Sequence, residues 1–175
     1  MFALQPLSTY STEQAAAFIV QQWGAPSVVA HDTVYEPHTL PGFVAVQDDE
    51  WLGVITYHIA GAACEIVTLD SIREGVGVGT ALIEAVVAET RRGGCTRVWL
   101  ITTNDNLHAL RFYQKRGFRL VAVHRDAVER ARHVKPEIPL VGNDGIPLHD
   151  EIELELIVSS MRCAEHGTGG MHAHA

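Results

Sequence analysis

The sequence predicts a mixed α/β domain of the α+β type, and three patterns carry this prediction. Residues 43–70 hold three strand-like runs separated by the turn-forming sequences DDE and GA, which is typical of an antiparallel meander. Apolar residues then recur at helical spacing in TALIEAVVAETRR, which ends at Gly93 and Gly94. The run RVWLITT is nearly continuous in apolar residues, as in a strand buried on both faces. We therefore expect a strand, helix, strand crossover at the centre of a sheet.

The segments around this centre are interpreted from their end signals. The run FALQPL alternates like a short strand, and Ser11 with Gln14 forms a capping box for a helix over TEQAAAFIVQQW that Gly24 ends. Residues 25–42, with three prolines, are expected to form an ordered loop. Downstream, NLHALRFYQKR is an amphipathic helix, while FRLVAVH and EIELELIV are strands. The sheet should therefore contain about six to seven strands, most of them antiparallel.

Composition indicates one ordinary domain and limits its partners. The chain has 175 residues and 47% hydrophobic content, so we expect one domain over 1–160 and a disordered tail over 161–175. The net charge of −8 disfavours nucleic acid and anionic membranes as partners and suits a neutral or cationic one. The N-terminus lacks a signal-peptide pattern, and no apolar run approaches the roughly 20 residues that span a bilayer, so a cytoplasmic location is expected.

Cysteines and histidines predict neither a disulfide framework nor a metal site. Cys64, Cys95 and Cys163 are an odd number without a C-x-x-C pair, and buried free thiols are expected. The histidines between residues 166 and 174 lie in a glycine-containing tail without preformed geometry. No metal is predicted.

The stretch REGVGVGTALIEAV (73–86) places three glycines at alternate positions directly before a helix. Exposed backbone N–H groups at a helix start bind phosphate. A Walker A loop would need Lys and then Ser or Thr after its last glycine, whereas Thr80 and Ala81 follow Gly79. A dinucleotide fingerprint would need a glycine where Thr80 lies and an acidic residue ending the next strand, which instead runs into TTN. A pyrophosphate cradle after the fourth strand of a mixed sheet remains.

Here the sequence resembles the GNAT acetyltransferase superfamily, whose acyl-CoA loop has Gln or Arg, two residues, Gly, one residue, and Gly or Ala. Gly77 and Gly79 match this loop, and Gly75 is an extra glycine. Glu74 takes the position of the Gln or Arg, which is a departure, and Arg73 could supply the missing positive charge.

A second motif of the same family starts 27 residues further on. It contains an Asn, an Ala three residues later, a Tyr seven residues later and a Gly-Phe pair, and this chain has Asn106, Ala109, Tyr113, Gly117 and Phe118 at that spacing. The resemblance covers about residues 43–125. It implies the GNAT fold, in which the fourth and fifth strands splay apart and the pantetheine arm of acetyl-CoA lies between them.

The resemblance also implies site residues. Those expected to bind acetyl-CoA, as the acyl-donor cosubstrate, are Leu69, Ser71, Arg73, Glu74, Gly75, Val76, Gly77, Val78, Gly79, Thr80, Asn106 and Tyr113. Tyr113 would also donate a proton to the departing thiolate, and the backbone N–H near Leu69 would polarise the thioester carbonyl. An aromatic core residue is the structural alternative for Tyr113, and an ordinary helix N-cap is the alternative for Asn106.

An amine must lose a proton before it attacks a thioester, so a base is required. Glu65 is the first candidate, because strand alternation would place Glu65, Val67 and Leu69 on one face; a solvated strand glutamate is the alternative. Asp70 should face the other way and is the second candidate, and His58 is the third.

The implied activity is direct transfer of an acetyl group from acetyl-CoA to a primary amine, without a covalent enzyme intermediate. The 25-residue connection 126–150 should border the acceptor cleft, so a small-molecule amine is favoured over a protein or peptide amine. The competing hypothesis is a noncatalytic CoA-binding module, which Glu74 favours and Tyr113 opposes. A homodimer is also considered, because the last strand would offer an exposed edge.

Overall fold

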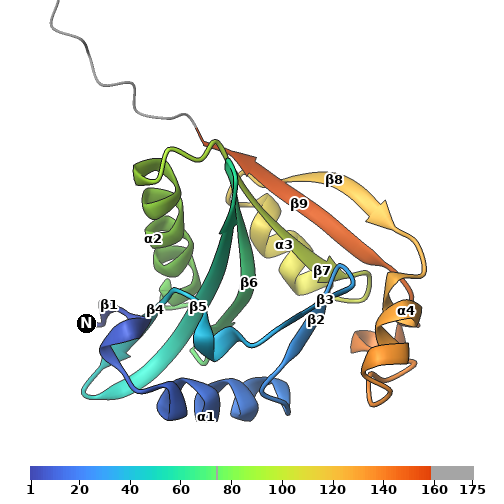
Figure 1. The fold of residues 1–175 in the computed structure, drawn as a ribbon, viewed down its shortest axis with the longest axis horizontal. Helices are drawn as coiled ribbons and strands as arrows, with labels where there is room; N and C mark the ends of the chain where they lie inside the picture. The colour runs from blue at the N-terminus through green and yellow to red at the C-terminus, as the bar shows by residue number, and fades with distance from the viewer. Residues whose placement is uncertain (74, 159–175) are drawn as a thin grey trace, which may run out of the picture.

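The computed structural model describes residues 1–73 and 75–158 and contains one seven-stranded sheet, in the order β1-β4-β5-β6-β7-β9-β8 (Figure 1). Glu74 and the tail predicted over 161–175 lie outside the described residues. The strands are β1 (Ala3–Pro6), β2 (Val28–Ala30), β3 (Thr33–Tyr35), β4 (Gly42–Gln47), β5 (Glu50–Ala60), β6 (Ala63–Ser71), β7 (Arg97–Thr103), β8 (Arg119–His124) and β9 (Glu151–Ile157). The helices are α1 (Thr12–Trp23), α2 (Val78–Arg92), α3 (Leu107–Gln114) and α4 (Ala127–Val134), with 3-10 turns at Leu7–Thr9, Pro37–Thr39 and Asn143–Gly145.

The predicted fold class is confirmed. Strands β4, β5 and β6 form the antiparallel meander, and α2 connects β6 to a parallel β7. β9 pairs antiparallel with both β7 and β8, so most of the sheet is antiparallel. Helix α1 begins as its capping box predicts, because the Ser11 hydroxyl accepts a hydrogen bond from the Gln14 N–H at 3.2 Å.

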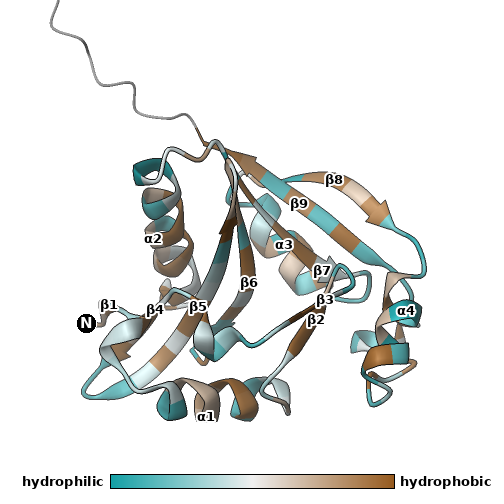
Figure 2. Cartoon of the chain, viewed as in Figure 1, coloured by the Kyte–Doolittle hydropathy of each residue, from teal (hydrophilic) through white to brown (hydrophobic). Residues whose placement is uncertain are grey.

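Apolar side chains cover both faces of the sheet. Helices α2 and α3 pack on one face over residues such as Ile55, Leu100 and Leu154, while α1 packs on the other face over Val44 and Val54. Figure 2 shows the corresponding alternation along β9, where hydrophobic and hydrophilic residues succeed one another. The core therefore fixes which face of each central strand meets which helix.

Two segments expected to be loops contain regular structure. Within residues 25–42, β2 and β3 form a hairpin whose turn residues, His31 and Asp32, have φ of 50° and 59°. The connection 126–150 begins with α4, whose Ala127, Val128 and Ala131 are buried. Pro37 and Pro136 follow closely after β3 and α4, and the apolar runs of these short elements were too short to predict regular structure.

Two strand environments also differ from expectation. β7 is not buried on both faces, since Val98 and Leu100 are buried whereas Arg97 and Trp99 on the other face are partly exposed. The last strand is not an edge, because β9 lies between β7 and β8 and the edge strands are β1 and β8. Chain order does not determine strand order, and β9 returns into the sheet because both of its neighbours offer it a hydrogen-bonding edge.

The sheet opens between β6 and β7. These strands pair only from Ala63 to Ile66 and from Arg97 to Leu100, although both continue further. The register between β5 and β6 shifts at the same level, since Tyr57 opposes Ile66 while Thr56 opposes Thr68, which leaves Val67 as the extra residue of a bulge. Counted along the seven-stranded sheet, β6 and β7 are its fourth and fifth strands, so the predicted splay between the fourth and fifth strands is present. The bulge in β6 lies beside it.

Among the described residues, no helix combines the length and apolar character needed to cross a membrane.

A substitution at Gly53 tests the close packing of β5 against the end of β6 and the start of α2. A Cβ at this position would lie 2.4 Å from the Asp70 carbonyl oxygen and 2.9 Å from a Val78 methyl group. We expect Gly53→Ala to destabilise the protein by about 2–3 kcal/mol in urea unfolding followed by circular dichroism. Gly93→Ala is the control, because its Cβ meets only ordinary contacts, at 3.5 Å and beyond. Equal stability of the two variants would contradict this account of the packing.

Candidate functional site

A groove of about 500 Å³ lies at the open edge of β6, between the start of α2 and helix α3. It brings together most of the residues predicted to bind a cosubstrate, namely Leu69, Ser71, Arg73, Gly75, Gly77, Val78, Gly79, Thr80, Asn106 and Tyr113. Val76 is exposed and is not among the described residues that line the groove. A larger cavity, of about 770 Å³, lies between the start of α1 and β4 and contains none of the predicted site residues.

The N-terminus of α2 forms one end of this groove. Gly75 and Gly77 have φ of 79° and 83°, a left-handed conformation in which glycine carries no Cβ penalty. Gly77 is the N-cap, and no described side chain caps the first turn of the helix. The N–H groups of that turn are therefore available to an anion, and the helix dipole favours negative charge there.

Arg116 adds a fixed positive charge beside this helix start. Its Nε donates to the Thr80 hydroxyl at 3.0 Å, and another guanidinium nitrogen donates to the Phe112 carbonyl at 2.7 Å. The guanidinium also lies 3.5 Å from the centre of the Phe112 ring. Arg73, the predicted cation, lines the groove as well, but it is exposed and pairs with Glu50 at 3.9 Å.

Sequence reasoning missed Arg116, although a signal was present. Asn106, Ala109, Tyr113 and Arg116 recur at intervals of three and four residues, from the N-cap of α3 to the turn after its end, and all four line the groove. The Asn106 side chain accepts a hydrogen bond from the Ala109 N–H at 3.0 Å, so it is a helix cap that also faces the groove.

Tyr113 contacts the core with its ring and lines the groove. It is only 8% exposed and packs edge-on against Phe112 and Phe118. Burial raises the pKa of its hydroxyl above the ordinary value, the negative charge of Asp70 raises it further, and Arg116 opposes both effects. The phenol therefore holds its proton at neutral pH.

The backbone N–H of Leu69 is directed into the opening between β6 and β7. The Ile72 N–H bonds to the Leu52 carbonyl at 2.8 Å, and hydrogen-bonded pairs alternate along an antiparallel ladder. The pairs that bond to β5 are therefore those of Ile72 and Asp70, and Leu69 presents its N–H and C=O to the other side. β7 has already left β6 at this level, so the ladder supplies no partner there.

The bulge changes which carboxylates share a face. Val54, Thr56 and His58 alternate along β5 without interruption, so their partners across the ladder also share one face. Those partners are Asp70, Thr68 and Glu65, and the hydroxyls of Thr56 and Thr68 lie 2.8 Å apart.

The expectation that Glu65 lies with Leu69, opposite Asp70, is therefore wrong, because alternation alone does not foresee a bulge. Leu69 packs toward the core under α2, whereas Glu65 and Asp70 lie on the other face of the sheet.

Glu65 lies under the β2–β3 hairpin rather than along the groove. It is 5% exposed, and the Tyr35 hydroxyl donates to it at 2.7 Å. Burial raises the pKa of its carboxyl group, while the Tyr35 hydrogen bond and the nearby His58 and His31 lower it.

The β2–β3 hairpin extends along one face of the sheet, from β6 toward β9 (Figure 1). At its tip, the His31 N–H donates to Glu151 of β9 at 3.2 Å, and Asp32 pairs with Arg130 of α4 at 3.2 Å. At its base, the Lys135 ammonium donates to the Ser27 carbonyl at 3.1 Å. The hairpin and α4 together therefore cover the face that carries Glu65.

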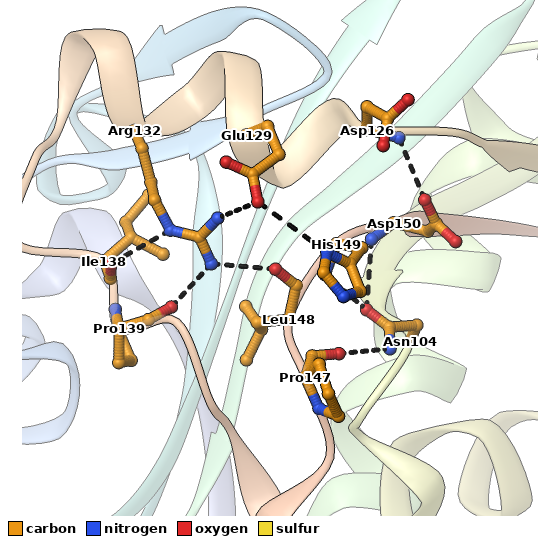
Figure 3. Close-up of polar contacts among 10 residues, drawn as sticks. All are labelled: Asn104, Asp126, Glu129, Arg132, Ile138, Pro139, Pro147, Leu148, His149 and Asp150. Atoms are coloured by element: carbon orange, nitrogen blue, oxygen red, sulfur yellow. Dashed lines mark hydrogen bonds and ion pairs between the residues drawn. The ribbon is translucent and has the colours of Figure 1, made fainter.

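Polar contacts hold α4 and the following connection in one conformation, as Figure 3 shows. The Arg132 guanidinium donates to the carbonyl groups of Ile138, Pro139 and Leu148 at 2.6–3.1 Å and pairs with Glu129 at 2.7 Å. Asn104, directly after β7, binds the same connection through Pro147, His149 and Asp150. These contacts therefore join the connection to α4 and to the end of β7.

Residues 6–118 match the Acetyltransferase (GNAT) family. The chain belongs to the GNAT acetyltransferase family. It is 41% identical over 159 residues to the uncharacterized protein YdhI of Bacillus subtilis, covering 90% of this chain and 99% of that protein.

Solved GNAT-type structures share the fold at low sequence identity. An acetyltransferase of Bacillus subtilis in complex with CoA superimposes with a TM-score of 0.64 at 19% identity, over 91% of this chain and 100% of the other. A GNAT family acetyltransferase of Elizabethkingia anophelis with acetyl-CoA bound gives 0.65 at 15% identity, over 90% and 98%.

Within the described part of this GNAT chain, no group of three or more His, Cys, Asp or Glu side chains is arranged to hold a metal ion.

Arg132 provides a test of the ordered connection. Replacing it by Met leaves three carbonyl groups without their donor, so we expect Arg132→Met to destabilise the protein by about 2–4 kcal/mol. Amide hydrogen exchange should increase first over residues 127–150. The matched control is Arg130→Met, which removes an exposed pair with Asp32 and one exposed hydrogen bond to the Arg125 carbonyl, and which should cost less than about 1 kcal/mol. If Arg130→Met were the less stable of the two variants, Arg132 would not be the residue that holds the connection in place.

Proposed function

We propose that the chain is an N-acetyltransferase that moves the acetyl group of acetyl-CoA to a primary amine by direct attack in a ternary complex. Family membership supports acetyl transfer in general, and the two solved relatives carry CoA or acetyl-CoA. The observation that carries the proposal is the groove itself. It joins an open helix N-terminus at one end to the unpaired backbone of Leu69 and the hydroxyl of Tyr113 at the other.

The cosubstrate fits the charges of the groove. The uncapped first turn of α2 would hold the pyrophosphate through its N–H groups, with Arg116 and Arg73 supplying positive charge. The open edge of β6 beyond Ile66 would receive the amide groups of pantetheine, because its backbone groups there have no strand beside them.

Two groups would act on the thioester. The Leu69 N–H would donate to the carbonyl oxygen as negative charge develops on it. Tyr113, which stays protonated at neutral pH because burial raises its pKa, would donate its proton to the departing thiolate. The amine's proton would pass to a carboxylate of β6. Glu65, the residue that the sequence favours, remains a prediction, and Asp70 is the second such carboxylate.

An enzyme-bound acyl intermediate is not part of the proposal. Cys64 and Cys95 are buried, and burial raises the pKa of the Cys64 thiol to about 11. A thiol in that state is a poor nucleophile at neutral pH.

A small-molecule acceptor is favoured over a protein or peptide. The β2–β3 hairpin and α4 cover the face of the sheet that carries Glu65, which in this proposal is the acceptor face, and Arg132 and Asn104 bind the connection after α4. A polypeptide would need an open channel across this face, whereas a small amine needs only a local recess. The overall charge of −8 suits a cationic acceptor.

The direct test measures release of free CoA from acetyl-CoA over a panel of polyamines, amino acids, aminoglycosides and short peptides. Release that depends on a small amine supports the proposal, and release only with peptides would replace it by peptide acetylation. Binding of acetyl-CoA by calorimetry without turnover would favour a noncatalytic binding module. Absence of binding would overturn the assignment of the groove.

Gly77 tests the helix start as the phosphate site. A side chain at its left-handed φ costs about 1–2 kcal/mol, so Gly77→Ala should shift the loop and weaken acetyl-CoA binding about tenfold by calorimetry. Gly24→Ala is the control, since Gly24 has a similar φ of 72° and, like Gly77, open space around its Cβ position. The control should lose stability but keep its affinity. Unchanged affinity in the Gly77 variant would count against this site.

Tyr113→Phe tests the proton donor. It removes one hydroxyl and keeps the packed ring, so we expect kcat to fall by about 100-fold while the Kd for acetyl-CoA changes little. Tyr57→Phe is matched to it, because Tyr57 is 7% exposed in the same core cluster and does not line the groove. Equal kcat in the two variants would exclude a catalytic role for Tyr113.

A further inference from the structure

Asp70 lies near the end of β6, beyond the last pair with β7 and still opposite Val54 of β5. It lines the groove together with Leu69 and Tyr113. Its side chain is on the face of the sheet that carries Val54 and Glu65, as the pairing of Asp70 with Val54 requires. The negative charge of Asp70 also raises the pKa of the Tyr113 hydroxyl.

Trp23, the last residue of α1, holds this carboxylate in place. The indole Nε1–H donates to Asp70 Oδ2 at 2.8 Å, and Gln22 beside it lines the groove. One carboxylate oxygen is therefore bound by a neutral donor, and the second oxygen has no hydrogen bond to any described residue.

The surroundings of Asp70 suit a group that takes up a proton near neutral pH. Burial raises its pKa to about 6, and the Trp23 hydrogen bond opposes this effect. The charged and titratable residues that share the groove are Tyr113 and His108 from α3, Arg116 from the turn after α3, and Arg73 from the loop after β6. No described cation pairs with Asp70, so the carboxylate is available to an incoming ammonium group.

Glu65 is placed differently. Its carboxylate accepts the Tyr35 hydroxyl at 2.7 Å, under the hairpin, and it is not among the described residues that line the groove. This contact joins β6 to the element that covers the acceptor face. The position of Glu65 therefore suits a residue that holds the hairpin in place.

We propose that Asp70 is the catalytic base, which takes the proton of the acceptor amine, and that Glu65 positions the β2–β3 hairpin. This inference rests on the proposed acetyltransferase function. The Asp70 carboxylate removes one proton from the ammonium group, and the freed electron pair of the nitrogen forms the C–N bond to the acyl carbon. The C–S bond breaks and its electron pair stays on sulfur, which takes the Tyr113 proton. The nitrogen loses its second proton, which restores Tyr113, and Asp70 releases the first proton to water.

The test is the pH dependence of kcat/KM for the most active amine of the panel, because its acid limb reports the base of the free enzyme. The carboxylate acts as a base only when ionised, so the rate of the unmodified enzyme should fall as the pH drops below about 6. Asp70→Asn should lower kcat by about 100-fold or more and abolish this limb, with the Kd for acetyl-CoA unchanged. Glu65→Gln should keep the limb.

Trp23→Phe provides a second measurement, the pH at which the acid limb occurs. This pH would not change if Asp70 had only a structural role. Loss of the indole donor removes the interaction that lowers the pKa of Asp70, so the acid limb should shift to higher pH. A limb that persists in Asp70→Asn and disappears in Glu65→Gln would overturn the inference and leave the acetyltransferase function intact. Acetyl-CoA binding without turnover in the unmodified protein would overturn both.

Discussion

The early end of the ladder between β6 and β7 is the constraint on which the site depends. Parallel pairing stops at Ile66 and Leu100, and both strands continue without each other. A strand that loses its neighbour exposes backbone donors and acceptors inside the protein, which is costly unless something binds them. The opening therefore creates a linear set of hydrogen-bonding groups that side-chain chemistry alone could not supply.

Two helices turn this opening into a groove. Helices α2 and α3 pack closely at Gly79 of α2, because a Cβ on Gly79 would lie 3.0 Å from the Phe112 ring of α3. Arg116 links the same two helices through Thr80 and through the ring and carbonyl of Phe112. The packing that joins α2 to α3 thus also fixes a positive charge beside a helix N-terminus that no described side chain caps.

The other face of the sheet carries two carboxylates, those of Glu65 and Asp70. The bulge at Val67 turns Asp70 onto the face that already carries Glu65, where α1 and the β2–β3 hairpin lie. Each carboxylate then receives one neutral donor, from Trp23 and from Tyr35. Burial disfavours the charged form of both, and a single hydrogen bond offsets this only in part, so their pKa values stay raised.

The sequence by itself determined the fold class and, through its resemblance to the GNAT family, most of the residues that line the groove. Gly77, Gly79, Asn106 and Tyr113 are local signals, since each reflects a turn, a cap or a helical spacing that neighbouring residues define. Only the tertiary structure decided that β9 lies inside the sheet, that Arg116 joins the site and that Asp70 shares a face with Glu65. These features depend on contacts between distant segments and on one extra residue in a ladder. A single bulge reverses the face on which every later side chain of its own strand lies, compared with simple alternation, and no pattern in the sequence of β6 predicts it.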